Sequence, residues 1–204
     1  MAQLKTNALT TLQRAKDFMG ISGDRYDTVI TMLINHVTDF MESFCGRIFK
    51  SATYTSEAHD GKGTKMLVAK YFPITAFTSL QYRDSDDPSD ETWNTFGTDQ
   101  YFWYDDGRIV HATAKFREVP KKYRMTYTAG YLIDFANENN ASLHTLPMEL
   151  ELICLRLIAA IFNSRKAEGI ETQRVGDISI KIKSEAFQNK EILETLGKYK
   201  LVTI

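Results

Sequence analysis

The chain has 204 residues, which fits one large domain or one domain with an arm. Hydrophobic residues make up 43% of the sequence and aromatic residues 12%, enough apolar surface to offset the chain entropy lost on folding, so wholesale disorder is excluded. The 25 lysine and arginine residues are balanced by 26 aspartate and glutamate residues, which argues against a general nucleic-acid coat that holds phosphates by a bulk positive field.

The N-terminal part of the sequence predicts two helices in succession. Thr10 or Thr11 can cap a short helix that ends at a glycine ten residues later. Asp24, with Asp27 three residues on, has the pattern of an N-terminal cap, and apolar residues recur after it at helical spacing. We therefore predict a second helix over residues 24–45.

Between residues 53 and 127 the residue pattern changes to runs of β-branched and aromatic residues separated by turn signals. The connections are too short for crossover helices, so we expect an antiparallel sheet. The predicted strands cover residues 53–58, 65–69, 77–83, 100–104, 108–111 and 123–128.

One stretch of this β-rich insert, residues 84–106, carries eight acidic side chains and neither lysine nor arginine. Its densest part, which we name the acidic lobe, consists of Asp84, Asp86, Asp87, Asp90 and Glu91. We expect the lobe to act by repulsion of other negatively charged surfaces. A merely solvated loop is the alternative.

Pro147 opens a third predicted helix, which ends before Gly169 and has acidic residues near its start and basic residues near its end. One apolar stripe of this helix consists of Leu150, Ile153, Leu157 and Ile161, and a second of Leu152, Leu155, Ala159 and Phe162. A helix this apolar needs cover on nearly all sides. Either it is the central helix of its domain, or, as we predict, the second stripe is a subunit interface.

The C-terminal part predicts a β element, in which Ile178, Ile180 and Ile182 alternate with polar residues, and then a short helix over residues 187–196. The last residues are β-prone and have no obvious partner inside the domain. The fold class is thus mainly α with a β-rich insert (α+β). We divide the chain into a helical core of three to four helices (1–50 and 140–196), a β-rich insert of antiparallel strands (51–139) and an extended C-terminal docking tail (197–204).

The residues that usually carry chemistry form no recognisable site in the sequence. The four histidines occur in different elements without metal-ligand spacing, and residues 60–64 have the wrong spacing for a phosphate loop and read as a hairpin turn. Cys45 and Cys154 fall in apolar periodic segments, so we expect buried thiols in a reducing compartment. We expect no metal, no cofactor, no signal peptide and no membrane span.

Several motifs, in order and at their spacing, resemble the head-tail connector (adaptor, head-completion) family of tailed bacteriophages. The resemblance begins with two opening helices that close in a Gly-Arg-x-Phe ending. It continues through a strand, a Pro-Ile turn and a second strand, and then a Tyr-Thr-Ala-Gly-Tyr run before the long helix. The corresponding residues are 44–49, 67–74, 78–80, 127–131, Pro147, 165–169 and 175–180.

The resemblance implies a non-enzymatic virion protein of the neck, between capsid and tail, assembled in the host cytoplasm. Such a protein forms a dodecameric ring on the portal protein after genome packaging, extends the DNA channel without sequence-specific contacts, and offers a platform for the stopper or tail. The portal-binding segment then falls on Lys198, Tyr199, Lys200, Leu201, Val202 and Ile204. The alternatives are another neck or tail-completion subunit, a small hydrolase with spatially assembled carboxylates, and a nucleic-acid-binding regulator.

Overall fold

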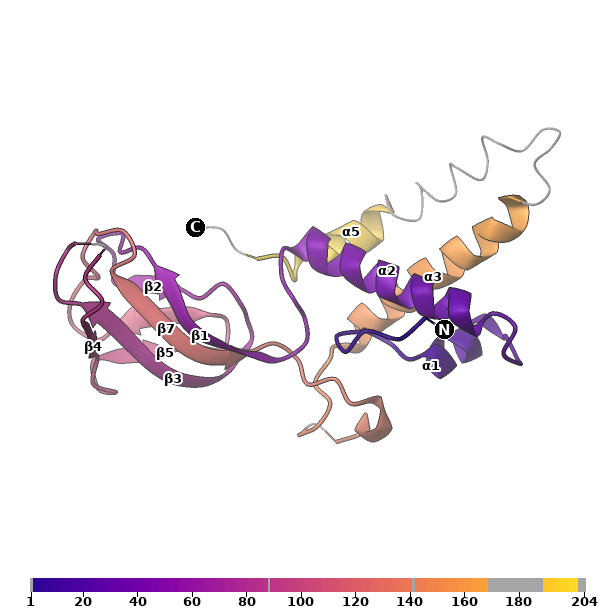
Figure 1. Cartoon of the computed structure of the whole chain (residues 1–204), viewed down its shortest axis with the longest axis horizontal. Helices are drawn as coiled ribbons and strands as arrows, with labels where there is room; N and C mark the ends of the chain where they lie inside the picture. The colour runs from indigo at the N-terminus through magenta and orange to yellow at the C-terminus, as the bar shows by residue number, and fades with distance from the viewer. Residues whose placement is uncertain (1, 88, 141, 169–188, 202–204) are drawn as a thin grey trace. The chain divides into compact units, whose positions relative to one another are not determined.

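A computed structural model describes residues 2–87, 89–140, 142–168 and 189–201 of the chain. These residues form two compact units (Figure 1). The helical unit combines the N-terminal residues up to Arg47 with the segment from Leu132 to Leu201, and the β unit extends from Ile48 to Tyr131. The predicted class, a mixed α+β fold, is confirmed.

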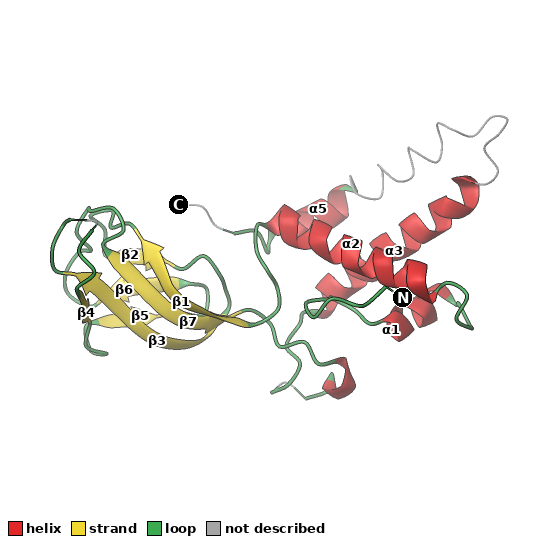
Figure 2. Cartoon of the chain, in the orientation of Figure 1, coloured by secondary structure: helices red, strands yellow, loops and turns green. Residues whose placement is uncertain are grey.

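Four α-helices build the described part of the helical unit (Figure 2). They are α1 (Leu12–Met19), α2 (Asp27–Cys45), α3 (Met148–Glu168) and α5 (Lys190–Gly197), and a short 3-10 helix, η1 (Phe135–Asn137), precedes α3. Within this unit α2 packs against α3, α1 contacts both, and α5 packs against α2. The predicted β element with Ile178, Ile180 and Ile182 lies outside the described residues.

The ends of the first two helices show which capping predictions hold. The hydroxyl of Thr11 accepts the Arg14 N–H and caps α1, as predicted, and α1 ends at a glycine in the left-handed conformation. The predicted N-terminal cap of α2 is wrong, because the helix starts after Tyr26 without a side-chain cap. The carboxylate of Asp27 instead accepts a hydrogen bond from Lys16 Nζ at 2.7 Å, which ties α2 to α1.

The β unit consists of two antiparallel sheets. The first has the strand order β1-β7-β3-β4 and the second β2-β6-β5. Their bounds are β1 (Ala52–His59), β2 (Met66–Val68), β3 (Ile74–Arg83), β4 (Trp93–Thr95), β5 (Tyr101–Trp103), β6 (Arg108–His111) and β7 (Tyr123–Ala129). The six predicted strands are all present, whereas β4 was not expected.

The core of the β unit follows from strict alternation along its central strand, β7. Tyr123, Met125, Tyr127 and Ala129 are buried, and the residues between them are only partly covered. Residues 60–64 connect β1 to β2, which belong to different sheets, so the predicted hairpin turn is wrong. A Cβ at Gly61 would lie 1.6 Å from the backbone oxygen of Arg117, so this loop packs against protein rather than cradling a phosphate.

Candidate assembly surfaces

The second apolar stripe of α3 is divided between core and surface. Leu155 and Phe162 are 8% and 1% exposed, and the Phe162 ring packs edge-on against Tyr26 at 5.3 Å. These two residues are therefore core of their own subunit, and the prediction that they form a subunit interface needs correction. Ala159 is half-buried and Leu152 is 45% exposed, so only these two members of the stripe are accessible to a partner.

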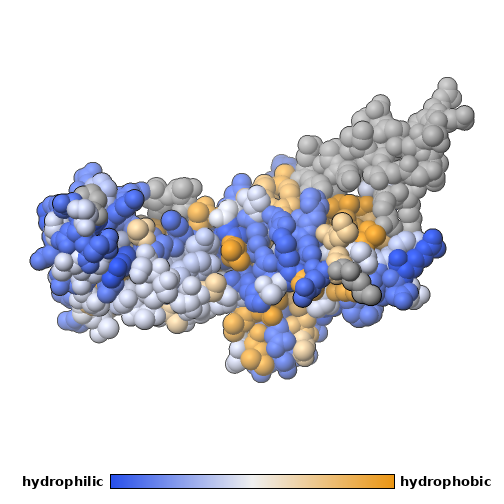
Figure 3. Space-filling view, in the orientation of Figure 1, coloured by the Kyte–Doolittle hydropathy of each residue, from blue (hydrophilic) through white to orange (hydrophobic). Residues whose placement is uncertain are grey.

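An exposed apolar patch precedes and begins α3. Met148, one helical turn before Leu152, is 77% exposed, and Leu132 and Leu143 in the preceding segment are also exposed. Figure 3 shows hydrophobic residues gathered on the helical unit over the segment that contains η1. Large exposed apolar side chains that cluster in this way typically mark interaction sites. We name Met148, Leu152 and Ala159 the α3 stripe.

An ion pair between the partly exposed Arg14 and the buried Glu151 links α1 to the start of α3. Glu151 accepts hydrogen bonds from Nε and Nη2 of Arg14 at 2.5 and 2.8 Å and from the Thr10 hydroxyl at 2.9 Å. Arg14 Nη1 also reaches Glu138 in the segment before α3, at 2.6 Å. This network ties the start of α3, and with it the α3 stripe, to α1 and to the segment before α3.

The described part of the C-terminal tail has partners within the helical unit. The Tyr199 hydroxyl donates to the Glu149 carboxylate, and Lys200 Nζ lies 4.1 Å from the centre of the Phe44 ring. Leu201 N–H donates to the Cys45 carbonyl at 2.9 Å. The expectation of a tail without a partner inside the domain is thus wrong for these residues. Lys198 is exposed, and Val202 and Ile204 lie outside the described residues.

The acidic lobe is less strongly charged in space than its sequence suggests. Asp86 accepts hydrogen bonds from Lys122 and Arg117, both at 2.7 Å, and these two cations hold the pKa of Asp86 below its usual range. The carboxylates of Asp87 and Asp90 accept N–H groups of their own loop, which likewise lowers their pKa values. Asp84 and Glu91 are exposed.

Two buried cations shape the lobe from inside. Lys122 donates to the carbonyls of Asp84 and Ser85 in addition to Asp86. Arg83 donates to the carbonyls of Asp87 and Lys121, at 2.9 and 2.5 Å. The lobe is therefore an ordered surface feature, held by Arg83 just before it and by Lys122 from a later part of the chain. The acidic count over residues 84–106 could not reveal these contacts.

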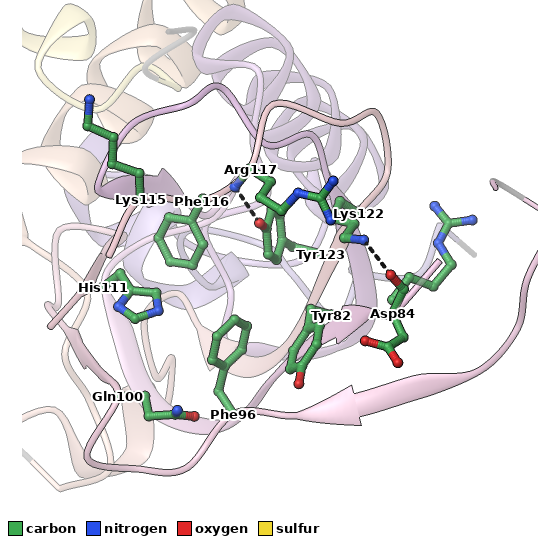
Figure 4. A pocket seen from close by; sticks show the side chains of 11 residues that line it. Tyr82, Asp84, Phe96, Gln100, His111, Lys115, Phe116, Arg117, Lys122 and Tyr123 are labelled. Carbon is green, nitrogen blue, oxygen red and sulfur yellow. Dashed lines mark hydrogen bonds between the residues drawn. The ribbon is translucent and has the colours of Figure 1, made fainter. Parts of the chain in front are cut away.

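A pocket of about 210 Å³ beside the lobe shows why the β unit offers no hydrolytic site there (Figure 4). Its walls are aromatic and basic, and Asp84 is the one carboxylic acid that lines it. The Tyr123 hydroxyl accepts the Arg117 N–H at 2.6 Å, so this oxygen is engaged in the loop structure. A pair of converging carboxylates, which glycoside hydrolysis requires, is missing from this pocket.

A second polar cluster in the β unit is buried and structural. Glu57 accepts hydrogen bonds from the Tyr127 hydroxyl at 2.9 Å and the Lys70 N–H at 3.2 Å, and pairs with His59 at 2.6 Å. Burial alone would raise the pKa of Glu57, but these hydrogen bonds and the histidine charge together lower it. Burial and the Glu57 charge raise the pKa of Tyr127, so its hydroxyl is a weaker acid than that of an exposed tyrosine.

Metal and thiol chemistry find no support in the part of the chain that is described. No group of three or more potential ligands among histidine, cysteine, aspartate and glutamate occurs within it. Cys45 and Cys154 are free and buried, as predicted, and burial raises the pKa of Cys45 to about 11. None of the helices within the described residues has the length and apolarity that a membrane span requires.

Comparison with known proteins gives a consistent result for the whole fold. The model of a family described as "Head completion protein" matches residues 8–190. A chain from the structure "Virion of native gene transfer agent (GTA) particle" is 14% identical with a TM-score of 0.56, and one from "Neck of empty GTA particle computed with C6 symmetry" is 12% identical with a TM-score of 0.54. Both matches cover 99% of this chain and 94% of the other. No curated protein matches.

Proposed function

This chain belongs to the head completion protein family, a family of structural proteins rather than enzymes, and from that premise we propose that it is a ring-forming subunit in the neck of a tailed bacteriophage or phage-like particle. The observation that carries the proposal is the family match, which extends over both the helical and the β unit. The likeness in fold to a chain from the neck of a gene transfer agent particle supports the same role.

We propose that the ring sits on the portal protein, prolongs the DNA channel and carries the stopper or tail on its other side. In this proposal a neighbouring subunit covers the α3 stripe. Exposed Met148 and Leu152 motivate that contact, because fully burying a large apolar side chain contributes roughly 1.5–3 kcal/mol, and Leu152, which is 45% exposed, would gain about half of that. Heterologous contacts of this kind generate a closed ring when the rotation between subunits closes.

DNA can pass through the channel freely only if it does not adhere to the channel wall. We propose that the acidic lobe supplies negative charge either to that wall or to a docking face. Asp84 and Glu91 are exposed and carry this role best, since Asp86 is already paired with Lys122 and Arg117. Replacing Asp84 and Glu91 by the corresponding amides should then alter DNA retention or tail joining while ring formation persists, and unchanged infectivity and DNA ejection would count against this role.

The role in the particle is tested by removing the protein from its producer. Without it, DNA-filled heads and free tails should accumulate separately, and adding the purified protein to the extract should restore joined particles. A Leu152→Asp variant provides a matched control, because it should fold yet fail to restore joining. Normal tailed particles in the absence of the protein would rule the proposal out.

A further inference from the structure

The edge strand β5 leaves part of its backbone available to a partner. Among the described residues, β5 pairs with β6 alone and forms one edge of the second sheet. Tyr104 N–H donates to a β6 carbonyl at 2.9 Å, and the Gln100 carbonyl accepts the N–H of the residue after β6 at 2.8 Å. Hydrogen bonding alternates along an antiparallel pair, so the N–H and C=O groups of Tyr101 and Trp103 point away from β6. An added strand would find its hydrogen-bond partners in place there.

β5 also lacks the features by which edge strands usually discourage such an addition. The edge strand β1 of the first sheet has one of them, a bulge between Tyr54 and Glu57, where Ser56 has a positive φ of 54°. The register of β5 with β6 is regular, and its three residues, Tyr101–Trp103, include neither a charged side chain nor a proline. β5 is therefore an unprotected edge.

An aromatic cleft lies beside this edge. Its volume is about 310 Å³, and it is lined by residues of β3, β5 and the turn before β5: Phe77, Thr78, Thr98, Tyr101, Phe102 and Trp103. The centre of the Phe77 ring lies 5.4 Å from that of Tyr101 and 6.2 Å from that of Trp103, on which it stacks. Phe102 and Trp103 are 59% and 41% exposed. Exposed aromatic side chains around a hollow typically mark a site of protein contact.

A second copy of this chain fits the edge poorly. Asp99 and Asp105 lie shortly before and after β5, and both are exposed. In the antiparallel register that pairs Tyr101 of each copy with Trp103 of the other, Asp99 lies opposite Asp105. Like charges directly opposite each other destabilise a strand pair. The charges therefore disfavour the pairing of β5 with itself.

A basic segment, in contrast, meets opposite charge at both ends of the strand. Arg108 on β6 is already paired with Asp106 at 2.7 Å, so it leaves Asp99 and Asp105 available. The Arg108 guanidinium also lies 4.8 Å from the centre of the Tyr104 ring, which shows that an aromatic face here accommodates a cation. Side chains of an added strand alternate between its two faces. Apolar residues on one face can fill the cleft while basic residues on the other remain near the acids.

We propose that β5 is a docking edge for a partner protein that adds an extended segment in which apolar and basic residues alternate. The main chain of the segment bonds to Tyr101 and Trp103, and its apolar side chains enter the cleft beside Phe77. Asp99 and Asp105 select for basic residues. This activity goes beyond ring formation and does not depend on it, so the free chain suffices for the test.

A synthetic peptide of alternating lysine and valine residues probes the edge of the full chain. Nuclear magnetic resonance titration should shift the amide signals of Tyr101 and Trp103. A peptide methylated at every backbone nitrogen has no donors and should bind at least about tenfold more weakly, as should a peptide with glutamate in place of lysine. Equal binding of the methylated peptide would refute strand addition, and equal binding of the glutamate peptide would refute selection for basic residues. No binding at millimolar peptide would refute the site.

Paired variants locate the charge effect. Asp99→Asn combined with Asp105→Asn should weaken binding of the lysine peptide about three- to tenfold at low salt. Asp24→Asn combined with Glu118→Gln removes two exposed carboxylates elsewhere and should leave the affinity unchanged. Equal weakening by both pairs would reduce the effect to net charge and overturn the site.

The alternative occupant has its own signature. A dimer of the free chain that forms with rising concentration and protects the Tyr101 and Trp103 amides would assign the edge to a second copy and overturn the proposal. Far-UV circular dichroism checks that each variant is folded.

Discussion

The ion pair between Arg14 and Glu151 offers a quantitative test of the helical unit. Glu151→Gln keeps the size of the side chain but leaves a single oxygen where two now accept three hydrogen bonds. Hydrogen bonds to charged groups contribute about 1.5–3 kcal/mol. The Arg14 side chain is 32% exposed and keeps Glu138 as a partner. The substitution therefore does not leave an unpaired buried charge, which is what makes breaking a fully buried pair so costly. We therefore expect a loss of about 1.5–2 kcal/mol.

The chain provides its own internal reference for this measurement. Both tryptophans, Trp93 and Trp103, lie in the β unit, whereas circular dichroism at 222 nm reports mainly on the helical unit. In urea, Glu151→Gln should lower the midpoint of the dichroism transition and leave the fluorescence transition in place. Glu138→Gln, which removes the exposed partner of Arg14, is the matched control and should cost at most about 1 kcal/mol. If both substitutions shift the dichroism midpoint equally, the reasoning about burial is refuted.

Three further outcomes are expected. The pKa of Glu57 is lowered in the folded state, so the stability that Glu57 contributes is present above the ordinary glutamate pKa and is lost as the pH falls through the lowered pKa. Glu57→Gln should flatten this dependence of stability on acid pH, measured by urea titrations followed by fluorescence. An unchanged dependence of stability on pH would contradict the prediction. Leu152→Asp should suppress assembly on portal rings in electron micrographs without changing the thermal midpoint, whereas Leu150→Asp, at a fully buried position, should unfold the helical unit; equal effects on stability would mean that Leu152 is ordinary core. Lys122→Met should release the acidic lobe and expose it to limited proteolysis, and a wild-type digestion pattern would show that the clamp is unnecessary.

The strands could be predicted because their signals are local. Alternating β-branched and aromatic residues with turns between them gave six of the seven strands that the described chain contains. The seventh, β4, is defined by pairing with the end of β3, where Trp93 lies opposite Arg83. Its three residues include the strand formers Trp93 and Thr95, but they follow a run of acids and turn formers, and three residues are too few to show a periodic pattern. Pairing across a sheet, unlike periodicity, is invisible locally.

The sequence could not show which candidate site residues are exposed or paired, because residues distant in the sequence determine both. Periodicity shows that α3 is apolar on two sides, but it cannot tell that Tyr26 covers Phe162 while Leu152 stays exposed. The acidic lobe was read from its own composition, although Lys122 and Arg117, some thirty residues later, neutralise part of it. Charge and apolarity are properties of the sequence, whereas exposure and pairing are properties of the fold.

The central claim, that this chain forms a ring on a portal, can be tested most directly by electron microscopy of purified portal rings mixed with the purified chain. We predict a complete additional ring stacked on one end of the portal, with the symmetry of the portal and an open axial channel. The Leu152→Asp variant, mixed in the same way, should fail to close that ring. Wild-type chain that leaves portal rings bare, or that binds them as scattered single subunits without closing a ring, would contradict the account.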